Sequence, residues 1–143
     1  MMYPELHHLG YATRSIDKSL QVFQNLGYRT EGPLITDKKL GIKVLFMIND
    51  QGNNHRIELV EDLEDGNTHP IPTILNQRPG SYHLAFLINS ISGYSTKHGM
   101  RAITECAPAK AFEGRHVQFF MSRDEGIIEL IANSAECQCI NVE

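Results

Sequence analysis

Two stretches of the chain show the same order of apolar and polar positions. Residues 8–16 read His-Leu-Gly-Tyr-Ala-Thr-Arg-Ser-Ile and align without gaps on residues 83–91, His-Leu-Ala-Phe-Leu-Ile-Asn-Ser-Ile. They share His, Leu, Ser and Ile at matching places. Such a repeat bears on the whole fold, because one supersecondary unit used twice predicts two similar modules.

Each copy leads into a predicted helix. We expect the first from Ser15 to Leu26, where apolar residues recur at helical spacing, and the second from Ser90 to His98. Ser15 is expected to cap the first helix, and a glycine follows the last residue of both.

Two further runs match between the halves and have the pattern of strands. Residues 41–47 correspond to residues 114–120, and in both cases a glycine precedes an alternating strand. Residues 56–60 correspond to residues 127–131, and each run carries one glutamate among apolar neighbours. Each half therefore predicts a strand, a helix and two or three further strands.

The length predicts one globular domain covering residues 1–143, with 41% apolar residues to form a core. Pro70, Pro72 and Pro79 indicate that the segment between the halves is mostly loop. The expected boundaries are about residues 6–61 for module one, about 62–80 for the connector, about 81–132 for module two and 133–143 for a C-terminal tail.

Charge and composition favour a protein that acts on small molecules. The 13 basic and 17 acidic residues give a net charge of -4, and the scattered basic residues predict no nucleic-acid partner. The N-terminus lacks the pattern of a secretory signal, and no apolar run approaches the roughly 18 residues of a membrane span. Cys106, Cys137 and Cys139 match neither a disulfide framework nor a zinc knuckle, so we expect reduced thiols in a cytoplasmic protein.

Two histidines and two glutamates stand at equivalent places in the two halves. His8 and His83 open the first strand of each half, and Glu58 and Glu129 lie in the last. Two modules packed about an approximate two-fold axis would bring equivalent strands together, so the four side chains could converge in one cleft. Imidazole nitrogen and carboxylate oxygen suit a divalent ion of Co, Ni, Mn, Zn or Fe. The four residues are therefore predicted to bind a metal.

Each of these residues also has an ordinary structural explanation. A lone strand glutamate usually faces solvent, and a lone histidine at a strand start is usually structural. Independent surface residues do not, however, predict the recurrence. His8 is preferred over its neighbour His7, because Tyr82 takes the equivalent place in the second half. The remaining histidines have no such counterpart and are expected at the surface or in loops: His55, His69, His98 and His116.

Four segments in order resemble the glyoxalase or vicinal-oxygen-chelate superfamily over about residues 6–132. They are residues 8–12, 56–60, 81–86 and 126–130. The resemblance implies an α+β fold in which two paired βαβββ modules form a cupped, mostly antiparallel sheet around a divalent metal. It also implies a homodimer.

Within that superfamily, residues 69–75 and 112–119 look similar to methylmalonyl-CoA epimerases. Those enzymes carry an acid or a glutamine shortly before the strand at Gly41, and an acid there is a proposed proton-transfer group. This chain has Lys38, Lys39 and Leu40 instead.

A metal site of this composition would support proton transfer next to a carbonyl. A metal bound to two substrate oxygens stabilises the enediolate that forms on deprotonation. Glu129, with Glu58 on the opposite side, is the expected general base. Two bases suit an epimerase or isomerase of a small acyl thioester or 2-substituted acid.

Other functions stay open. The ligand set resembles equally well a glyoxalase I-type lactoylglutathione lyase acting on a thiol adduct of a 2-oxoaldehyde. A ring-cleaving dioxygenase fits less well, because that chemistry usually uses three protein ligands. A non-enzymatic binding protein of the bleomycin-resistance kind is the remaining alternative.

Specificity rests on residues that have two explanations each. Four aromatic residues are either pocket or core: Tyr11, Phe46, Phe86 and Phe119. Four basic residues either meet a phosphate or carboxylate or form a solvated rim: Lys38, Lys39, Lys43 and Arg115.

Overall fold

The computed structural model of the chain describes residues 4–65, 72 and 79–133. These residues belong to two compact units, described separately below. The N-terminal unit comprises His8–Tyr82, and the C-terminal unit combines Met1–His7 with His83–Glu143, in both cases as far as the residues are described.

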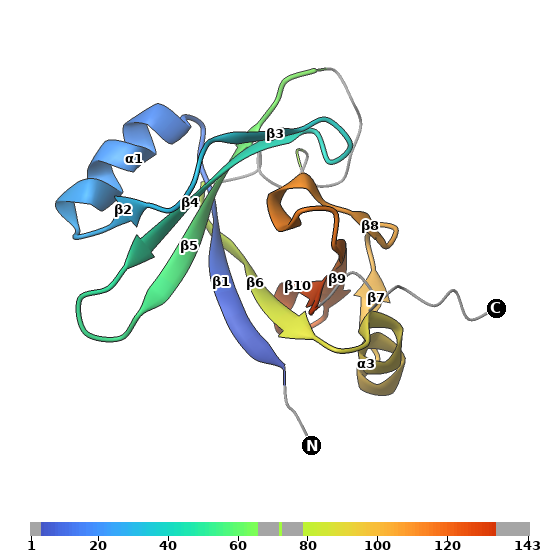
Figure 1. Cartoon of the computed structure of the whole chain (residues 1–143). Coiled ribbons are helices and arrows are strands. Elements are labelled where there is room, and N and C mark those ends of the chain that lie inside the picture. Colours follow the sequence, from blue (N-terminus) through green and yellow to red (C-terminus); the bar gives the residue numbers. More distant parts are fainter. Residues whose placement is uncertain (1–3, 66–71, 73–78, 134–143) are drawn as a thin grey trace. The chain divides into compact units, whose positions relative to one another are not determined.

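The N-terminal unit is a small mixed sheet with a helix on one face (Figure 1). It contains β1 (Glu5–Ala12) from His8 onward, α1 (Ile16–Asn25), β2 (Arg29–Thr30), β3 (Ile35–Asp37), β4 (Ile42–Asn49) and β5 (His55–Asp62). Strand β5 pairs in parallel with β1 and antiparallel with β4. Strands β2 and β3 both pair antiparallel with β4.

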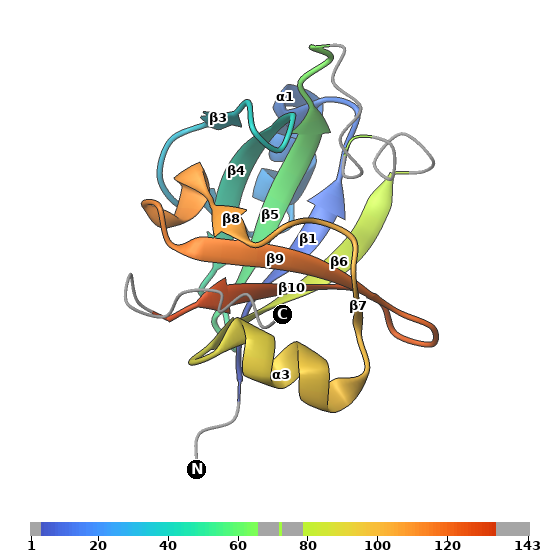
Figure 2. The same cartoon turned by 90° about the vertical axis from the view of Figure 1, so that its right-hand side faces the viewer.

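The C-terminal unit repeats this arrangement. It contains β6 (Gly80–Ile88) from His83 onward, α3 (Ile91–His98), β7 (Arg101–Ala102), β8 (Ala107–Pro108), the 3-10 helix η1 (Lys110–Phe112), β9 (His116–Ser122) and β10 (Gly126–Ala132). Strand β10 pairs in parallel with β6 and antiparallel with β9, and β7 and β8 pair with β9. Figure 2 shows α3 against β9 and β10. The predicted repeat of a strand, a helix and further strands is thus confirmed.

The helix ends follow the expected local chemistry, with one difference. Ser15 is extended, with φ of -153°, and its side chain accepts a hydrogen bond from the amide of Lys18, so the predicted N-cap is confirmed. The helix ends one residue before Leu26, which is 62% exposed and does not extend the predicted apolar face. Gly99 ends α3 in the left-handed conformation, with φ of 66°.

Strand alternation separates two faces in each sheet. The helix-facing core of the N-terminal unit consists of Ile16, Leu45, Met47, Ile57 and Leu59. The equivalent core of the C-terminal unit consists of Ile88, Ile91, Phe120, Leu130 and Ala132. Strand residues of the other parity point to the opposite face of each sheet.

The strands that flank the predicted connector end and begin at its expected limits of about residues 62 and 80. Asp62 is the last residue of β5 and Gly80 the first of β6. Pro72 is buried and helical. Most of the predicted connector, with His69, and the predicted tail from residue 134 on lie outside the described residues. The single-domain organisation stays a prediction.

Two further observations concern the cysteines and the possibility of a membrane span. Cys106 is disulfide-bonded, so the expectation of a reduced thiol is wrong there. Sequence spacing missed this bond because tertiary structure, not spacing, brings two thiols together. Among the described helices, none has both the length and the apolarity to cross a membrane.

Candidate metal centre

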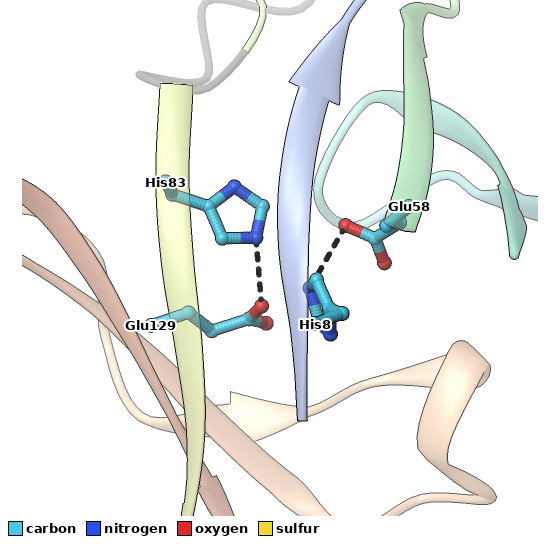
Figure 3. Close-up of side chains that lie close together, drawn as sticks. All are labelled: His8, Glu58, His83 and Glu129. Atoms are coloured by element: carbon cyan, nitrogen blue, oxygen red, sulfur yellow. Dashed lines mark ion pairs between the residues drawn. The ribbon is translucent and has the colours of Figure 1, made fainter. Parts of the chain in front are cut away.

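The N-terminal unit contains the first predicted pair of ligands. Strand pairing sets Gly10 of β1 opposite Glu58 of β5, which brings His8, two residues earlier on the same face, near the glutamate. His8 Nε2 lies 3.5 Å from Glu58 Oε1 (Figure 3). Both residues are buried, with exposures of 1% and 4%.

The C-terminal unit contains the second pair in the same geometry. Ala85 of β6 lies opposite Glu129 of β10, and His83 precedes Ala85 by two residues. His83 Nε2 lies 3.2 Å from Glu129 Oε1 (Figure 3). Both residues are 3% exposed. In each unit, therefore, a parallel strand pair with the same register produces one buried histidine–glutamate pair.

The two pairs fit the donor spacing of a first-row divalent ion. Two donors bound at about 2.1 Å lie about 3.0 Å apart at a right angle and about 3.4 Å apart at the tetrahedral angle. The observed separations of 3.5 Å and 3.2 Å are close to these values. All four residues are buried and of types that hold metal ions. Buried charged groups are normally paired or coordinate metals, so the donor set suits such an ion.

Two of the four aromatic candidates contact the histidines. The ring of Phe46 lies 5.2 Å from that of His8, at an interplanar angle of 73°. The ring of Phe119 lies 5.3 Å from that of His83, at 86°. The other two candidates, Tyr11 and Phe86, pack against the helix-facing cores. Sequence reasoning did not separate these two groups.

The basic candidates are either exposed or engaged within their own units. Lys38 and Lys39 are exposed. The amine of Lys43 lies 2.6 Å from a carboxylate oxygen of Glu61, and that hydrogen bond raises the pKa of Lys43 above its usual 10.5. The guanidinium of Arg115 donates to the backbone oxygens of Phe112 and Asn133.

Asp37 is a buried acid that sequence reasoning missed. It ends β3, is 6% exposed, and accepts a hydrogen bond from the amide of Leu40 at 3.1 Å. Strand pairing sets it opposite Ile42, on the face that continues to Phe46 and Glu58. A buried carboxylate therefore directly precedes the segment that begins at Lys38. The polar residues that follow Asp37 in the sequence gave no reason to expect that its side chain is buried.

The other described histidines lie in different surroundings. The ring of His7 lies 5.3 Å from that of Phe112, edge to face. His55 is exposed, and its ring contacts the hydroxyl of Tyr28. His116 is partly buried on β9. The side chain of His98 and the whole of His69 lie outside the described residues.

Comparison with known proteins identifies the family. The model of the Glyoxalase/Bleomycin resistance protein/Dioxygenase superfamily matches residues 7–119. The chain belongs to this superfamily. The expected α+β fold and the resemblance on which it was based are thereby confirmed. No curated protein matches the chain in sequence.

Solved structures of the same fold include epimerases. A hypothetical protein from Bacillus halodurans C-125 is 24% identical with a TM-score of 0.74, over 93% of this chain and 96% of that chain. Methylmalonyl-CoA epimerase from Mycobacterium tuberculosis is 21% identical with a TM-score of 0.74, over 94% and 93%. A variant Streptomyces coelicolor methylmalonyl-CoA epimerase, in complex with 2-nitronate-propionyl-CoA, is 16% identical with a TM-score of 0.73, over 94% and 100%. At these identities the likeness establishes the fold.

Proposed function

We propose that this chain is a divalent-metal-dependent epimerase or isomerase acting on a small acyl thioester or 2-substituted acid. The observation that carries the proposal is the pair of equivalent, buried histidine–glutamate contacts, one in each unit. The epimerases among proteins of the same fold support this reaction class.

In this proposal both pairs bind one ion. A single histidine–glutamate pair supplies two protein ligands, whereas catalytic and structural metal sites usually have three or four. His8, Glu58, His83 and Glu129 together supply four. The metal would be Co, Ni, Mn, Zn or Fe, because nitrogen and oxygen donors suit these ions.

In the proposed proton transfer, the ion and the two glutamates have different roles. When bound, the ion supplies positive charge that stabilises negative charge on substrate oxygens as a neighbouring C–H bond loses its proton. The carboxylate of Glu129 accepts that proton as general base. Glu58, the equivalent residue of the other unit, starts this step protonated and returns its proton to the substrate carbon, and both glutamates then exchange protons with solvent. Removal of the proton from one face of the carbon and its return to the other face invert the configuration at that carbon.

A glyoxalase I-type lyase is the second candidate. The same two histidines and two glutamates suit that reaction, in which a proton moves between adjacent carbons of a thiol adduct of a 2-oxoaldehyde. Parallel assays with methylmalonyl-CoA and with the methylglyoxal–glutathione adduct distinguish the two functions. Turnover of the adduct alone would replace the epimerase proposal by the lyase.

Metal analysis is the first test. The protein is purified without a histidine tag, and its bound metals are measured by mass spectrometry for the wild type, His83→Ala and Glu129→Ala. We expect about one divalent ion per chain in the wild type and loss of the ion in both variants. His55→Ala is the matched control, because this exposed histidine lies in neither pair.

The outcomes separate enzyme from binding module. No bound metal, even after incubation with Ni, Co, Mn and Zn, would contradict the metal-dependent reaction. It would leave a metal-free binding protein of the bleomycin-resistance kind. Loss of the ion in His55→Ala as well would show that binding is not specific to the proposed site.

The proposal includes a small-molecule substrate and assembly as a homodimer. Family membership supports the substrate class. Light scattering of the purified protein would test the dimer, and a monomer at micromolar concentration would remove it from the proposal.

A further inference from the structure

Each histidine–glutamate pair has a third member, a phenylalanine. Phe46 of β4 lies directly opposite Glu58 in the strand register and contacts the ring of His8. In the other unit, Phe119 of β9 lies directly opposite Glu129 and contacts the ring of His83. One phenylalanine thus adjoins both ligands of its pair.

The recurrence holds in sequence as well as in structure. Phe46 stands five residues after Gly41, and Phe119 stands five residues after Gly114. Both side chains are buried, with exposures of 8% and 2%. Both contact the histidine ring edge to face, with centroids 5.2 Å and 5.3 Å apart.

The contact between the phenylalanine and imidazole rings can determine the direction in which the metal-binding nitrogen of the histidine points. An imidazole binds a metal along the lone pair of one ring nitrogen, so rotation of the ring moves the donor away from the ion. An aromatic ring packed edge to face against it favours one orientation. Hydrogen-bonding neighbours that orient ligating histidines typically affect metal affinity by about tenfold or more, and a single ring contact is expected to have a smaller effect.

We propose that Phe46 and Phe119 are positioning residues that hold the imidazoles of His8 and His83 in their metal-binding orientation. The inference rests on the proposed metal site and adds to it a requirement for an aromatic ring. A leucine would fill much of the same volume but would lack the flat face that restricts the imidazole.

The chain offers a matched control for this idea. Phe120 is the next residue of β9, is equally buried at 2%, and packs in the helix-facing core with Ile91 and Leu130. Because neighbouring strand residues face opposite sides of a sheet, Phe120 points away from His83. Phe120→Leu therefore removes a buried ring from the same strand without touching the pair.

The test compares Phe46→Leu, Phe119→Leu and Phe120→Leu with the wild type. We measure the dissociation constant for Co²⁺ or Zn²⁺ by titration, and the imidazole resonances of the metal-free protein by nitrogen-15 NMR. The first two variants should weaken metal binding about three- to tenfold, the range that corresponds to one aromatic contact. They should also broaden or multiply the resonances of the adjacent histidine. Phe120→Leu should change neither.

Thermal denaturation checks that every variant is folded. Phe119→Met serves as the second substitution if Phe119→Leu does not fold. Unchanged affinity and unchanged imidazole resonances in Phe46→Leu and Phe119→Leu would overturn the positioning role while the metal site stands. Equal loss in Phe120→Leu would overturn it too, because general loosening would then explain the effect. A wild type that binds no metal, with imidazole order still lost beside the substituted ring, would overturn the proposed function and retain the positioning contact.

Discussion

At the residue scale, the informative side chains are buried carboxylates beside histidines. Glu58 lies between Ile57 and Leu59, which are in the helix-facing core, so alternation correctly indicates that Glu58 faces the other way. Alternation does not indicate that this face is buried, because on an ordinary sheet it would be solvent. Glu58 is only 4% exposed, and this burial results from tertiary packing.

The two-base mechanism makes a prediction for single residues. Glu129→Gln and Glu58→Gln keep an oxygen donor but remove the base, so epimerisation should fall by about 10²- to 10⁴-fold, the usual contribution of general acid–base catalysis. Metal content should be retained better than in Glu129→Ala.

Isotope exchange separates the two glutamates. With one base left, each variant should still exchange the substrate proton with deuterium from solvent on one face, which proton NMR follows for each stereoisomer. Loss of exchange with both stereoisomers in both variants would contradict the assignment of one base to each face.

At the element scale, Glu61 joins three elements of the N-terminal unit. One carboxylate oxygen accepts a hydrogen bond from the amide of Ile16 in the first turn of α1, at 2.7 Å. The other lies 2.6 Å from the amine of Lys43 on β4. A carboxylate at a helix N-terminus satisfies a free amide and interacts favourably with the helix dipole. Sequence patterns predicted the strands and the helix, but this connection spans 45 residues and has no local signal.

Removal of this connection should destabilise the protein measurably. Glu61→Ala should lower the free energy of unfolding by about 1–2 kcal/mol, because a charged hydrogen bond to the amide and an ion pair are both lost. Lys43→Met, which removes only the partly exposed ion pair, should cost less than about 1 kcal/mol. Urea denaturation at neutral pH checks both values.

The pH dependence follows from the raised pKa of Lys43. A folded-state pKa above the usual 10.5 means that the ion pair stabilises the protein fully below that pH and loses its effect as the pH rises through the raised value. The difference in stability between wild type and Lys43→Met should therefore shrink in strongly alkaline solution. A constant difference would show that the lost packing of the Lys43 side chain, not its charge, is responsible.

At the scale of the whole molecule, the proposed ion would take ligands from both units. A ligand that binds only the folded state stabilises it by about 2.7 kcal/mol at a hundred times its dissociation constant. Metal should therefore raise the melting temperature, and EDTA should reverse the shift. Calorimetry of His8→Ala and His83→Ala tests the sharing: each substitution, in a different unit, should abolish most of the shift. A shift lost in only one of them would indicate an ion held by one unit alone.

The sequence by itself determined the repeat, and the repeat determined most of the fold. Its matched runs of alternating and helical periodicity predicted the order of elements in both halves, and the recurrence of His8 and Glu58 at His83 and Glu129 selected four candidates from all the histidines and acids. These signals are local, since periodicity and caps depend on near neighbours.

Only the tertiary structure decided which side chains meet. The parallel register that sets Gly10 opposite Glu58, the antiparallel register that sets Phe46 opposite the same glutamate, and the bond from Glu61 to Ile16 all join residues far apart in the chain. A shift of one residue in either register would have turned every side chain of the strand to the other face. Burial of Asp37 and the contacts of Phe46 with His8 depend on that register, so composition and spacing did not reveal them.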